Sequence, residues 1–380
     1  MDLMIELGSV ISFEKGKKPI ELATEPQKGY LPYVDIEAFE TGTIKRYTSG
    51  EKCLACEDGD ILIVCDGSRS GLVGYAIHGF VGSTLAKISC EVLLDQYLFY
   101  FLQGKYRLLN TNKKGTGTPH LNPTLLRQQK IVVPPIEEQQ RIVTRIEELF
   151  SELDSAVETL QKAKQQLEVY RQAVLKEAFD GFVEKTTVRE ITSIVTSGSR
   201  GWAKYYSDNG AMFIRIGNLT HSGIGIDFSD IQHLCLPENA EGRRSRLVQG
   251  DILVSITADL GSIGLIPDNI GEAYINQHIA LVRFNNKKQS RFMAWYFRSD
   301  CGQKELLKNK RGAGKLGLGL DDIRDSLVPI VSDEVAELTV ANIESRLSVC
   351  DGIEKTINEA LQQAEAMRQS ILKKAFEGRL

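Results

Sequence analysis

Apolar residues recur every three or four positions along two long stretches of the chain. In the first stretch they fall at Ile142, Ile146, Leu149, Leu153, Ala156, Leu160, Ala163, Leu167, Tyr170 and Val174. This is heptad spacing, which places one apolar stripe along an α-helix and favours a coiled coil. Pro134 and Pro135 precede the stretch and Gly181 follows it. We therefore expect one helix of roughly 43 residues, about 65 Å long at a rise of 1.5 Å per residue.

A second stretch with similar spacing begins near Asp333 and ends before Gly378. Its apolar positions step by three and three around Cys350, which predicts a local stammer. Each stripe alone would face water, so we expect the helices to pack together as an antiparallel coiled coil; the alternative is that each helix lies on its own globular domain. The predicted seam residues are Ile142, Ile146, Leu149, Leu153, Leu160, Leu167, Val174, Ile353, Ile357, Met367 and Ile371.

The rest of the chain has the pattern of mixed domains. Short apolar runs such as "DILIVCD", "MFIRIGN" and "HIALVRF" are separated by glycine-rich turns and predict strands. One helical candidate accompanies each set of strands, "LDQYLFYFLQGKYRLL" and "SRFMAWYFRSDCGQKELLK". These patterns predict α/β (α+β) domains without identifying a particular fold.

An internal repeat relates the two halves of the chain. The stretch "RQAVLKEAFDG" at 171–181 returns as "RQSILKKAFEG" at 368–378, and "GDIL" occurs at 59–62 and again at 250–253. We interpret this as a tandem duplication of one domain followed by one helix. It predicts that the repeated helix ends dock in equivalent ways, each on the opposite domain. The expected boundaries are 1–136 and 182–331 for the two domains, and 137–181 and 332–380 for the helical regions.

Composition and cysteine usage narrow the class of protein. The 380 residues are 42% hydrophobic and 25% charged, which is typical of a globular protein. No stretch has the length and apolarity of a membrane span, and the first residues lack the basic character of a signal peptide, so we expect a cytoplasmic protein. The seven cysteines indicate free thiols in a reducing compartment. For Cys53 and Cys56 we favour buried thiols over half of a zinc site, and we expect no metal.

Catalytic motifs are missing from the sequence. No Asn/Asp-Pro-Pro-aromatic motif of a base methyltransferase occurs, and the Gly-Lys of "GAGKLGLG" is followed by leucine instead of the hydroxyl residue of a P-loop. We therefore predict a chain without catalytic residues or enzyme activity.

Basic and polar residues in the loops are the remaining candidates for chemistry. Both helical regions are acidic, whereas 182–331 carries 19 basic against 16 acidic residues. Arg and Lys neutralise phosphates, and Arg or Asn can read base edges. Any one of these residues alone is better explained as a solvated surface charge, but their recurrence in both copies favours DNA contact. The candidates are Lys15, Lys17, Lys18, Arg46, Arg69, Lys113, Lys114, His120, Arg200, Lys204, Arg215, Asn218, Arg243, Arg244, Lys310, Arg311 and Lys315.

Together, "KIVVPPIEEQQRIVTRIEELF", "RQAVLKEAFDGFV" and the repeated "GDIL" resemble the specificity subunit of type I restriction-modification systems. The resemblance implies that two target-recognition domains each read half of an interrupted double-stranded DNA site. It also implies that the helices space the domains and bind two methylation subunits, which carry S-adenosylmethionine, and that restriction subunits join the full complex. The second helix begins "LVPIVSDEVAELTV", without Pro-Pro or Glu-Glu-Gln, so its contact with a methylation subunit is expected to differ.

Two other functions stay open from the residues alone. One is a coiled-coil adaptor whose globules bind proteins, which would lack the steep salt dependence of DNA binding. The other is a stand-alone methyltransferase, which would have to bind the cofactor without a partner.

Overall fold

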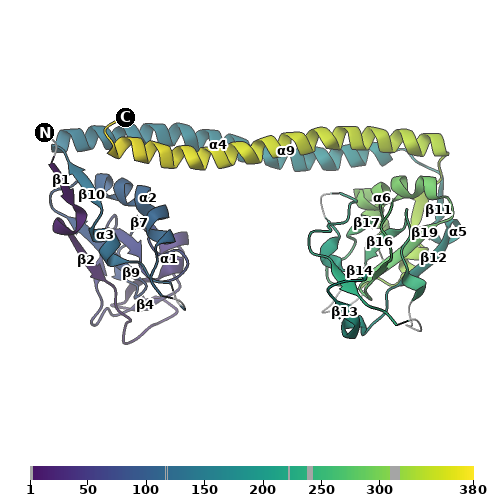
Figure 1. Ribbon diagram of the computed structural model, residues 1–380, viewed down its shortest axis with the longest axis horizontal. Coiled ribbons are helices and arrows are strands. Elements are labelled where there is room, and N and C mark those ends of the chain that lie inside the picture. Colours follow the sequence, from purple (N-terminus) through teal and green to yellow (C-terminus); the bar gives the residue numbers. More distant parts are fainter. Residues whose placement is uncertain (1–2, 116, 118, 221–222, 238–242, 309–316) are drawn as a thin grey trace. The chain divides into compact units, whose positions relative to one another are not determined.

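The computed structural model describes residues 3–115, 117, 119–220, 223–237, 243–308 and 317–380 (Figure 1). They form two compact units, one made of Met1–Gln161 with Asn358–Leu380 and the other of Lys162–Ile357. We call these unit 1 and unit 2 and describe each separately. Two 44-residue helices, α4 (Ile136–Phe179) and α9 (Asp333–Phe376), contribute to both units.

Unit 1 contains two four-stranded sheets and one two-stranded ribbon. The first sheet has the order β2-β9-β6-β7 and is antiparallel throughout, the second has the order β4-β3-β8-β5 with β3 and β8 parallel, and β1 pairs with β10. The strands are β1 (Leu3–Glu6), β2 (Ile11–Lys15), β3 (Leu31–Val34), β4 (Tyr47–Thr48), β5 (Ala55–Cys56), β6 (Ile61–Val64), β7 (Val73–Tyr75), β8 (Gly79–Val81), β9 (Leu85–Cys90) and β10 (Lys130–Val133). The shorter helices are η1 (Leu7–Ser9), α1 (Ile36–Thr41), α2 (Asp95–Thr111) and α3 (Pro123–Arg127).

Unit 2 repeats this arrangement. Its first sheet has the order β12-β19-β16-β17, its second has the order β13-β15-β14-β18 with β14 and β18 parallel, and β11 pairs with β20. The strands are β11 (Lys185–Thr187), β12 (Thr192–Ser197), β13 (Tyr206–Ser207), β14 (Ala211–Ile214), β15 (Gln232–Leu234), β16 (Ile252–Ser255), β17 (Ile263–Leu265), β18 (Ala273–Ile275), β19 (Ile279–Phe284) and β20 (Leu327–Pro329). The shorter helices are α5 (Val188–Ile191), η2 (Trp202–Tyr205), η3 (Ile216–Asn218), η4 (Arg243–Ser245), η5 (Lys287–Gln289), α6 (Ser290–Arg298), α7 (Asp300–Leu307) and α8 (Leu320–Arg324).

The matching strand orders confirm the tandem duplication and the mixed α+β class. The repeated "GDIL" leads into β6 in unit 1 and into β16 in unit 2, and each of these strands is fully buried. The copies differ in their second sheets, since β5 is an edge strand beside β8 whereas β13 is an edge strand beside β15. The sheets are mainly antiparallel, because one parallel pair occurs in each unit among the described strands.

The two long helices pair antiparallel within each unit. In unit 1, Ile146 and Phe150 of α4 form an apolar cluster with Ile371 and Leu372 of α9. Arg368 pairs with Asp154, and its guanidinium lies 4.4 Å from the centre of the Phe150 ring. In unit 2, Arg171 lies 2.7 Å from Asp351 and 3.0 Å from Glu354. Later residues of one helix thus face earlier residues of the other, which confirms the predicted coiled-coil pairing.

Part of the predicted seam is wrong. Ile353 and Met367 are 44% and 54% exposed, and the stammer at Cys350 does not occur. The buried stripe of α9 continues in steps of four and three through Cys350, Glu354, Ile357, Leu361, Ala364, Arg368 and Ile371. Glu354 and Arg368 occupy two of these positions as members of interhelical ion pairs, so a purely apolar pattern missed them. The other predicted seam residues, Ile142, Ile146, Leu149, Leu153, Leu160, Leu167, Val174, Ile357 and Ile371, are buried or half-buried.

The repeated helix ends dock in equivalent ways. Phe179 at the end of α4 packs edge-on against Phe292 and Tyr296 of α6 in unit 2. Phe376 at the end of α9 packs edge-on against Tyr97 and Phe101 of α2 in unit 1. The glycines that follow, Gly181 and Gly378, have φ of 96° and 67°, the left-handed conformation that ends a helix. Each helix therefore starts beside one copy and docks its end on the other.

None of the helices formed by described residues is long and apolar enough to cross a lipid bilayer.

Candidate nucleic-acid interface

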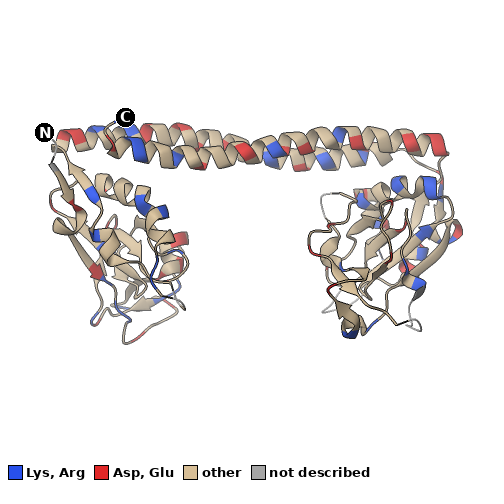
Figure 2. Ribbon diagram, in the orientation of Figure 1, with Lys and Arg blue, Asp and Glu red and all other residues tan. Residues whose placement is uncertain are grey.

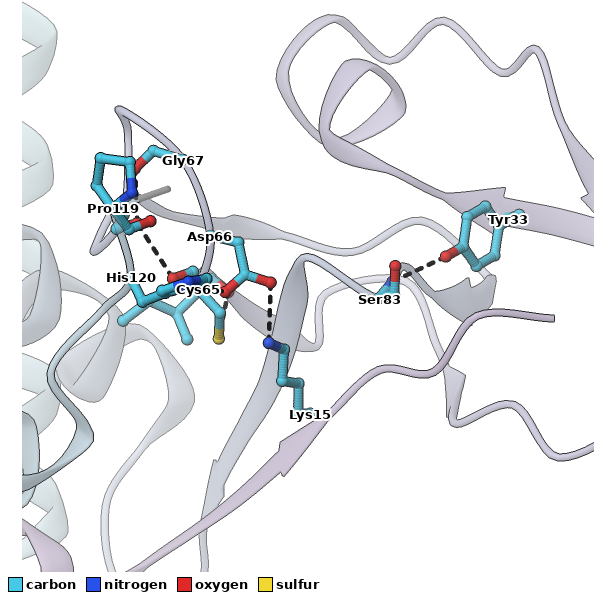
Figure 3. Close-up of polar contacts among 10 residues, drawn as sticks. Lys15, Tyr33, Cys65, Asp66, Gly67, Ser83, Pro119 and His120 are labelled. Atoms are coloured by element: carbon cyan, nitrogen blue, oxygen red, sulfur yellow. Dashed lines mark hydrogen bonds and ion pairs between the residues drawn. The ribbon is translucent and has the colours of Figure 1, made fainter. Parts of the chain in front are cut away.

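A turn after β6 brings three chain segments of unit 1 together. Asp66 follows the buried strand β6, Lys15 ends β2, and His120 lies in the loop after α2. The Lys15 ammonium donates to Asp66 Oδ2 at 2.8 Å, and His120 Nδ1 lies 2.7 Å from Asp66 Oδ1 (Figure 3). An ionised carboxylate only accepts hydrogen bonds, so His120 Nδ1 carries the proton. We call these three residues the Asp66 cluster.

The electrostatics of the Asp66 cluster favour an ionised carboxylate. Burial alone would raise the pKa of Asp66, but the hydrogen bonds from Lys15 and His120 outweigh it and hold that pKa below its usual range. The Asp66 side chain is 19% exposed, whereas those of Lys15 and His120 are 48% and 51% exposed. The Asp66 carboxylate thus lies beneath its partners, and the Lys15 ammonium and the His120 imidazole lie at the protein surface.

Backbone hydrogen bonds fix the loops that carry the cluster. Gly67 N donates to Pro119 O at 2.8 Å, and Leu121 N donates to Cys65 O at 2.7 Å. The hydroxyl of the fully buried Ser70 donates within the same turn to Gly67 O at 2.7 Å. Gly67 has φ of 107°, a conformation that glycine adopts without strain. The positions of Asp66 and His120 therefore follow from main-chain pairing between the two loops.

The equivalent position in unit 2 carries a different set of side chains. Leu318 N donates to Ile256 O at 3.0 Å, and Thr257 and Gly317 form the bridge that Asp66 and His120 form in unit 1. Thr257 is therefore the counterpart of Asp66. Its hydroxyl lies 2.7 Å from Nδ1 of His278, whose Nε2 lies 2.7 Å from the side-chain amide of Gln277. Both turns hold an imidazole, but a carboxylate partner in unit 1 is replaced by a hydroxyl in unit 2.

The other candidates of unit 1 lie in loops, and several are engaged in ion pairs. Arg69 pairs with Glu40, Arg46 lies 3.6 Å from Asp35, and Lys113 donates to Ser68 O at 2.9 Å. The remaining candidates, Lys17, Lys18 and Lys114, are exposed. Figure 2 shows Lys and Arg in loops on the side of each sheet region away from the long helices, as well as on α2 and α6.

The described candidates of unit 2 differ in how accessible they are. Arg200, Lys204 and Arg244 are exposed, and Arg215 lies 3.3 Å from Asp230. Asn218 is corrected to a structural role, because it is 3% exposed and its amide donates to Asp227 O and Asp230 O, which holds the loop together. Arg243 begins η4, and nothing is described of its side chain. Lys310, Arg311 and Lys315 lie outside the described residues.

The Cys-x-x-Cys motif has a buried thiol at its second position. Burial raises the pKa of the Cys56 thiol to about 11, and Cys56 Sγ lies 3.5 Å from the carbonyl oxygen of Ile77. A thiol with a raised pKa is a poor source of the thiolate that binds zinc. Cys53 is half-buried, and burial raises the pKa of its thiol as well.

Asp66, Thr257 and His278 are site residues that were not predicted from the sequence. A pattern of basic residues in loops does not mark a carboxylate such as that of Asp66 or a hydroxyl such as that of Thr257. Their signal lies in the repeat, because residues 66 and 257 stand at the same distance after the two "GDIL" motifs.

Comparison with known proteins identifies similar chains along the whole length. Residues 3–169 match the family described as "Type I restriction modification DNA specificity domain". The type I restriction enzyme MjaVIII specificity subunit of Methanocaldococcus jannaschii is 25% identical, over 99% of this chain and 92% of its own. The EcoBI specificity subunit of Escherichia coli is 24% identical, over 100% of this chain and 86% of its own.

Solved structures share the fold. A chain from a study of complex assembly and conformational transition of the type I R-M system superposes with a TM-score of 0.78 at 18% identity, covering 100% of this chain and 98% of that chain. The HsdS subunit from Thermoanaerobacter tengcongensis superposes with a TM-score of 0.56 at 18% identity, covering 100% of this chain and 97% of that chain.

Proposed function

We propose that this chain, which is similar over its whole length to specificity subunits of type I restriction-modification systems, is the non-catalytic subunit that selects the DNA sequence. Each recognition domain reads one half of an interrupted double-stranded site. The two readers are related but differ in their side chains, so the two half-sites differ in sequence. The observation that carries this proposal is the duplicated fold with a changed side-chain set at the equivalent turn, Asp66 in unit 1 and Thr257 in unit 2.

The loop cations support DNA as the ligand. Exposed Lys and Arg side chains in loops neutralise phosphates, whereas hydrogen-bonding groups fixed by the backbone can read base edges. Similarity to specificity subunits over 99% of the chain does not favour the alternative of an adaptor whose globules bind proteins.

The partners follow from the same proposal. Methylation subunits, two in the full complex, bind the paired helices and carry S-adenosylmethionine, and restriction subunits join for cleavage. This chain then needs no cofactor of its own, and the complex works in the cytoplasm. The long helices offer apolar side chains for such contacts, since Val169 and Leu338 are 71% and 73% exposed.

Domain exchange combined with methylome sequencing tests the proposal. The chain is expressed with its methylation subunits in a host without other methyltransferases, and residues 182–331 are replaced by the equivalent domain of a relative. We expect a two-part methylated sequence from the native chain and a change in only one part from the hybrid. The matched control replaces residues 1–136 and should change only the other part.

Two results would contradict the proposal. A hybrid that alters both parts would show that the domains do not read independently. Methyl transfer by the purified chain without partner subunits would show that the chain is itself an enzyme.

A further inference from the structure

The Asp66 cluster differs from the other ion pairs of unit 1 in how it is built. It joins three segments separated by 51 and 54 residues, and each carboxylate oxygen accepts one hydrogen bond from a different segment. The pair of His78 and Glu57 is a useful contrast, since it also joins an imidazole to a carboxylate, at 2.6 Å. There the carboxylate is 71% exposed, whereas Asp66 is 19% exposed beneath its partners.

The cluster leaves hydrogen-bonding capacity at the surface. Lys15 uses one of its three N–H donors on Asp66, so two remain for an outside partner. His120 uses Nδ1, which leaves Nε2 as the ring atom for an outside contact. Both Asp66 oxygens already accept a hydrogen bond, so the carboxylate contributes by fixing the directions of its neighbours.

Unit 2 varies this same position while keeping the backbone. Thr257 there holds His278, and Gln277 extends the set, so a hydroxyl, an imidazole and an amide take the place of the Asp66 cluster. At this turn the backbone is preserved and the side chains differ. Such a position allows two duplicated domains to recognise different DNA sequences.

We propose that Asp66 is a positioning residue for the first half-site, and that it fixes Lys15 and His120 so that the Lys15 ammonium donates to hydrogen-bond acceptors of the DNA. This rests on the proposed function. The acceptors are either purine N7 and O6 atoms at a base edge or the oxygens of one phosphate, because both groups accept from a lysine ammonium. Without its carboxylate partner, Lys15 samples several rotamers and the contact loses its preorganisation.

The experiment uses the reconstituted complex of the full chain with its methylation subunits, and duplexes that carry the methylated site. Asp66→Asn keeps the size of the side chain but replaces one acceptor by a donor that faces the cations. Lys15→Gln removes the ammonium from a half-exposed position and should leave the fold intact. The control variant Glu57→Gln changes the exposed His78 pair in the same unit.

We expect Asp66→Asn and Lys15→Gln each to weaken binding of the native site by about tenfold. If the acceptors belong to a base edge, discrimination within the first half-site falls by the same factor. Both variants should leave the second half-site unchanged, and Glu57→Gln should leave both half-sites unchanged. If Asp66 acts through Lys15, the double variant loses no more than Lys15→Gln alone. If Asp66 had only a structural role, the binding loss of the double variant would equal the sum of the losses of the two single variants.

Modified duplexes distinguish the two sources of acceptors. If the partner is a base edge, 7-deazapurine at one position weakens the native complex but leaves Lys15→Gln unaffected. If the partner is a phosphate, a methylphosphonate at that position weakens the native complex but not the Lys15→Gln complex. Lys15→Gln then also lowers the slope of log affinity against log salt concentration by about one.

Affinities of Asp66→Asn and Lys15→Gln for the native site within twofold of the native complex would overturn this inference and leave the proposed function standing. A native complex that methylates no two-part sequence would remove the basis of both.

Discussion

Asp251 explains why the "GDIL" motif recurs. In unit 2 its side chain is fully buried, and both carboxylate oxygens lie 2.7 Å from the guanidinium of Arg283. It also accepts from Val248 N at 2.7 Å, which closes the turn before β16. Asp60 does the same in unit 1 with Glu57 N and Lys87. The motif therefore links a tight turn to a cation on the neighbouring strand.

The two copies should respond differently to loss of this aspartate. Asp251→Ala removes both carboxylate bonds of the mostly buried Arg283 guanidinium, which keeps its bond to Arg246 O, and leaves Val248 N–H without its side-chain acceptor. We therefore expect a loss of about 3 kcal/mol in the free energy of unfolding. Asp60 and Lys87 are 24% and 25% exposed, and Asp60→Ala should cost only about 1 kcal/mol. Chemical denaturation measures the change in the free energy of unfolding for each variant. Hydrogen exchange of β16 and β19 shows whether the destabilisation lies at these strands. Equal losses in both variants would contradict the argument from burial.

At the scale of elements, the ends of α4 and α9 each dock through a phenylalanine that packs against two aromatic side chains. Phe179 is 5% exposed among Phe292 and Tyr296, whereas Phe376 is half-buried against Tyr97 and Phe101. We expect Phe179→Ala to destabilise unit 2 by about 3 kcal/mol and to increase hydrogen exchange in the last turns of α4. Phe376→Ala should lower the stability of unit 1 by less, because Phe376 is only half-buried.

Substitution by leucine at the same positions is the control, because it keeps most of the apolar volume. Exchange that stays unchanged in Phe179→Ala would show that the helix end does not depend on this contact.

The helices were predictable because their signal is periodic and local. Heptad spacing, the prolines before the first helix and the two glycines identified both elements. The register of the second seam was not predictable, since Glu354 and Arg368 are half-buried there through ion pairs with the other helix. A charge at a seam position breaks an apolar pattern in the sequence, although its interhelical pair continues the packing in the fold.

The candidate interface was predictable only in part, because its residues meet through long-range contacts. Lys15 and His120 were found as polar loop residues, but the Asp66 carboxylate that joins them lies more than fifty residues from either. Asn218 has the chemistry of a base reader, yet it is buried and satisfies the backbone of its own loop. The residue type determines which contacts a side chain can make, and the tertiary contacts determine whether that side chain is accessible to DNA.

At the scale of the whole molecule, the duplication connects sequence to function. Both copies keep the buried strands and the docking of a helix end, whereas the turn at Asp66 and Thr257 has diverged. Changes confined to such turns can alter a half-site without disturbing the cores. The 44-residue helices are separate from these turns in sequence, so spacing and sequence choice can vary independently.

The proposed role of the helices as a spacer makes a quantitative prediction. Inserting one heptad beside Ala163 and a matching heptad beside Ala360 preserves both seams, because seven residues rotate an ideal helix by only about 20°. Each helix then lengthens by about 10 Å. With DNA rising about 3.4 Å per base pair, the preferred gap between half-sites should grow by roughly three base pairs.

The twist of the DNA determines how much binding is weakened when the gap becomes longer. Three base pairs turn the duplex by about 100° at 10 to 10.5 base pairs per turn, so the second reader meets a rotated groove unless the helices or the DNA twist to compensate. We therefore expect a longer gap with weakened binding, or loss of specific binding, when a library of gap lengths is tested for methylation. A heptad in only one helix serves as control, and it should disrupt the pairing by placing the seams out of register. Recognition of the original gap at unchanged affinity by the doubly lengthened chain would show that α4 and α9 do not set the distance, because the separation of the readers would then be independent of helix length.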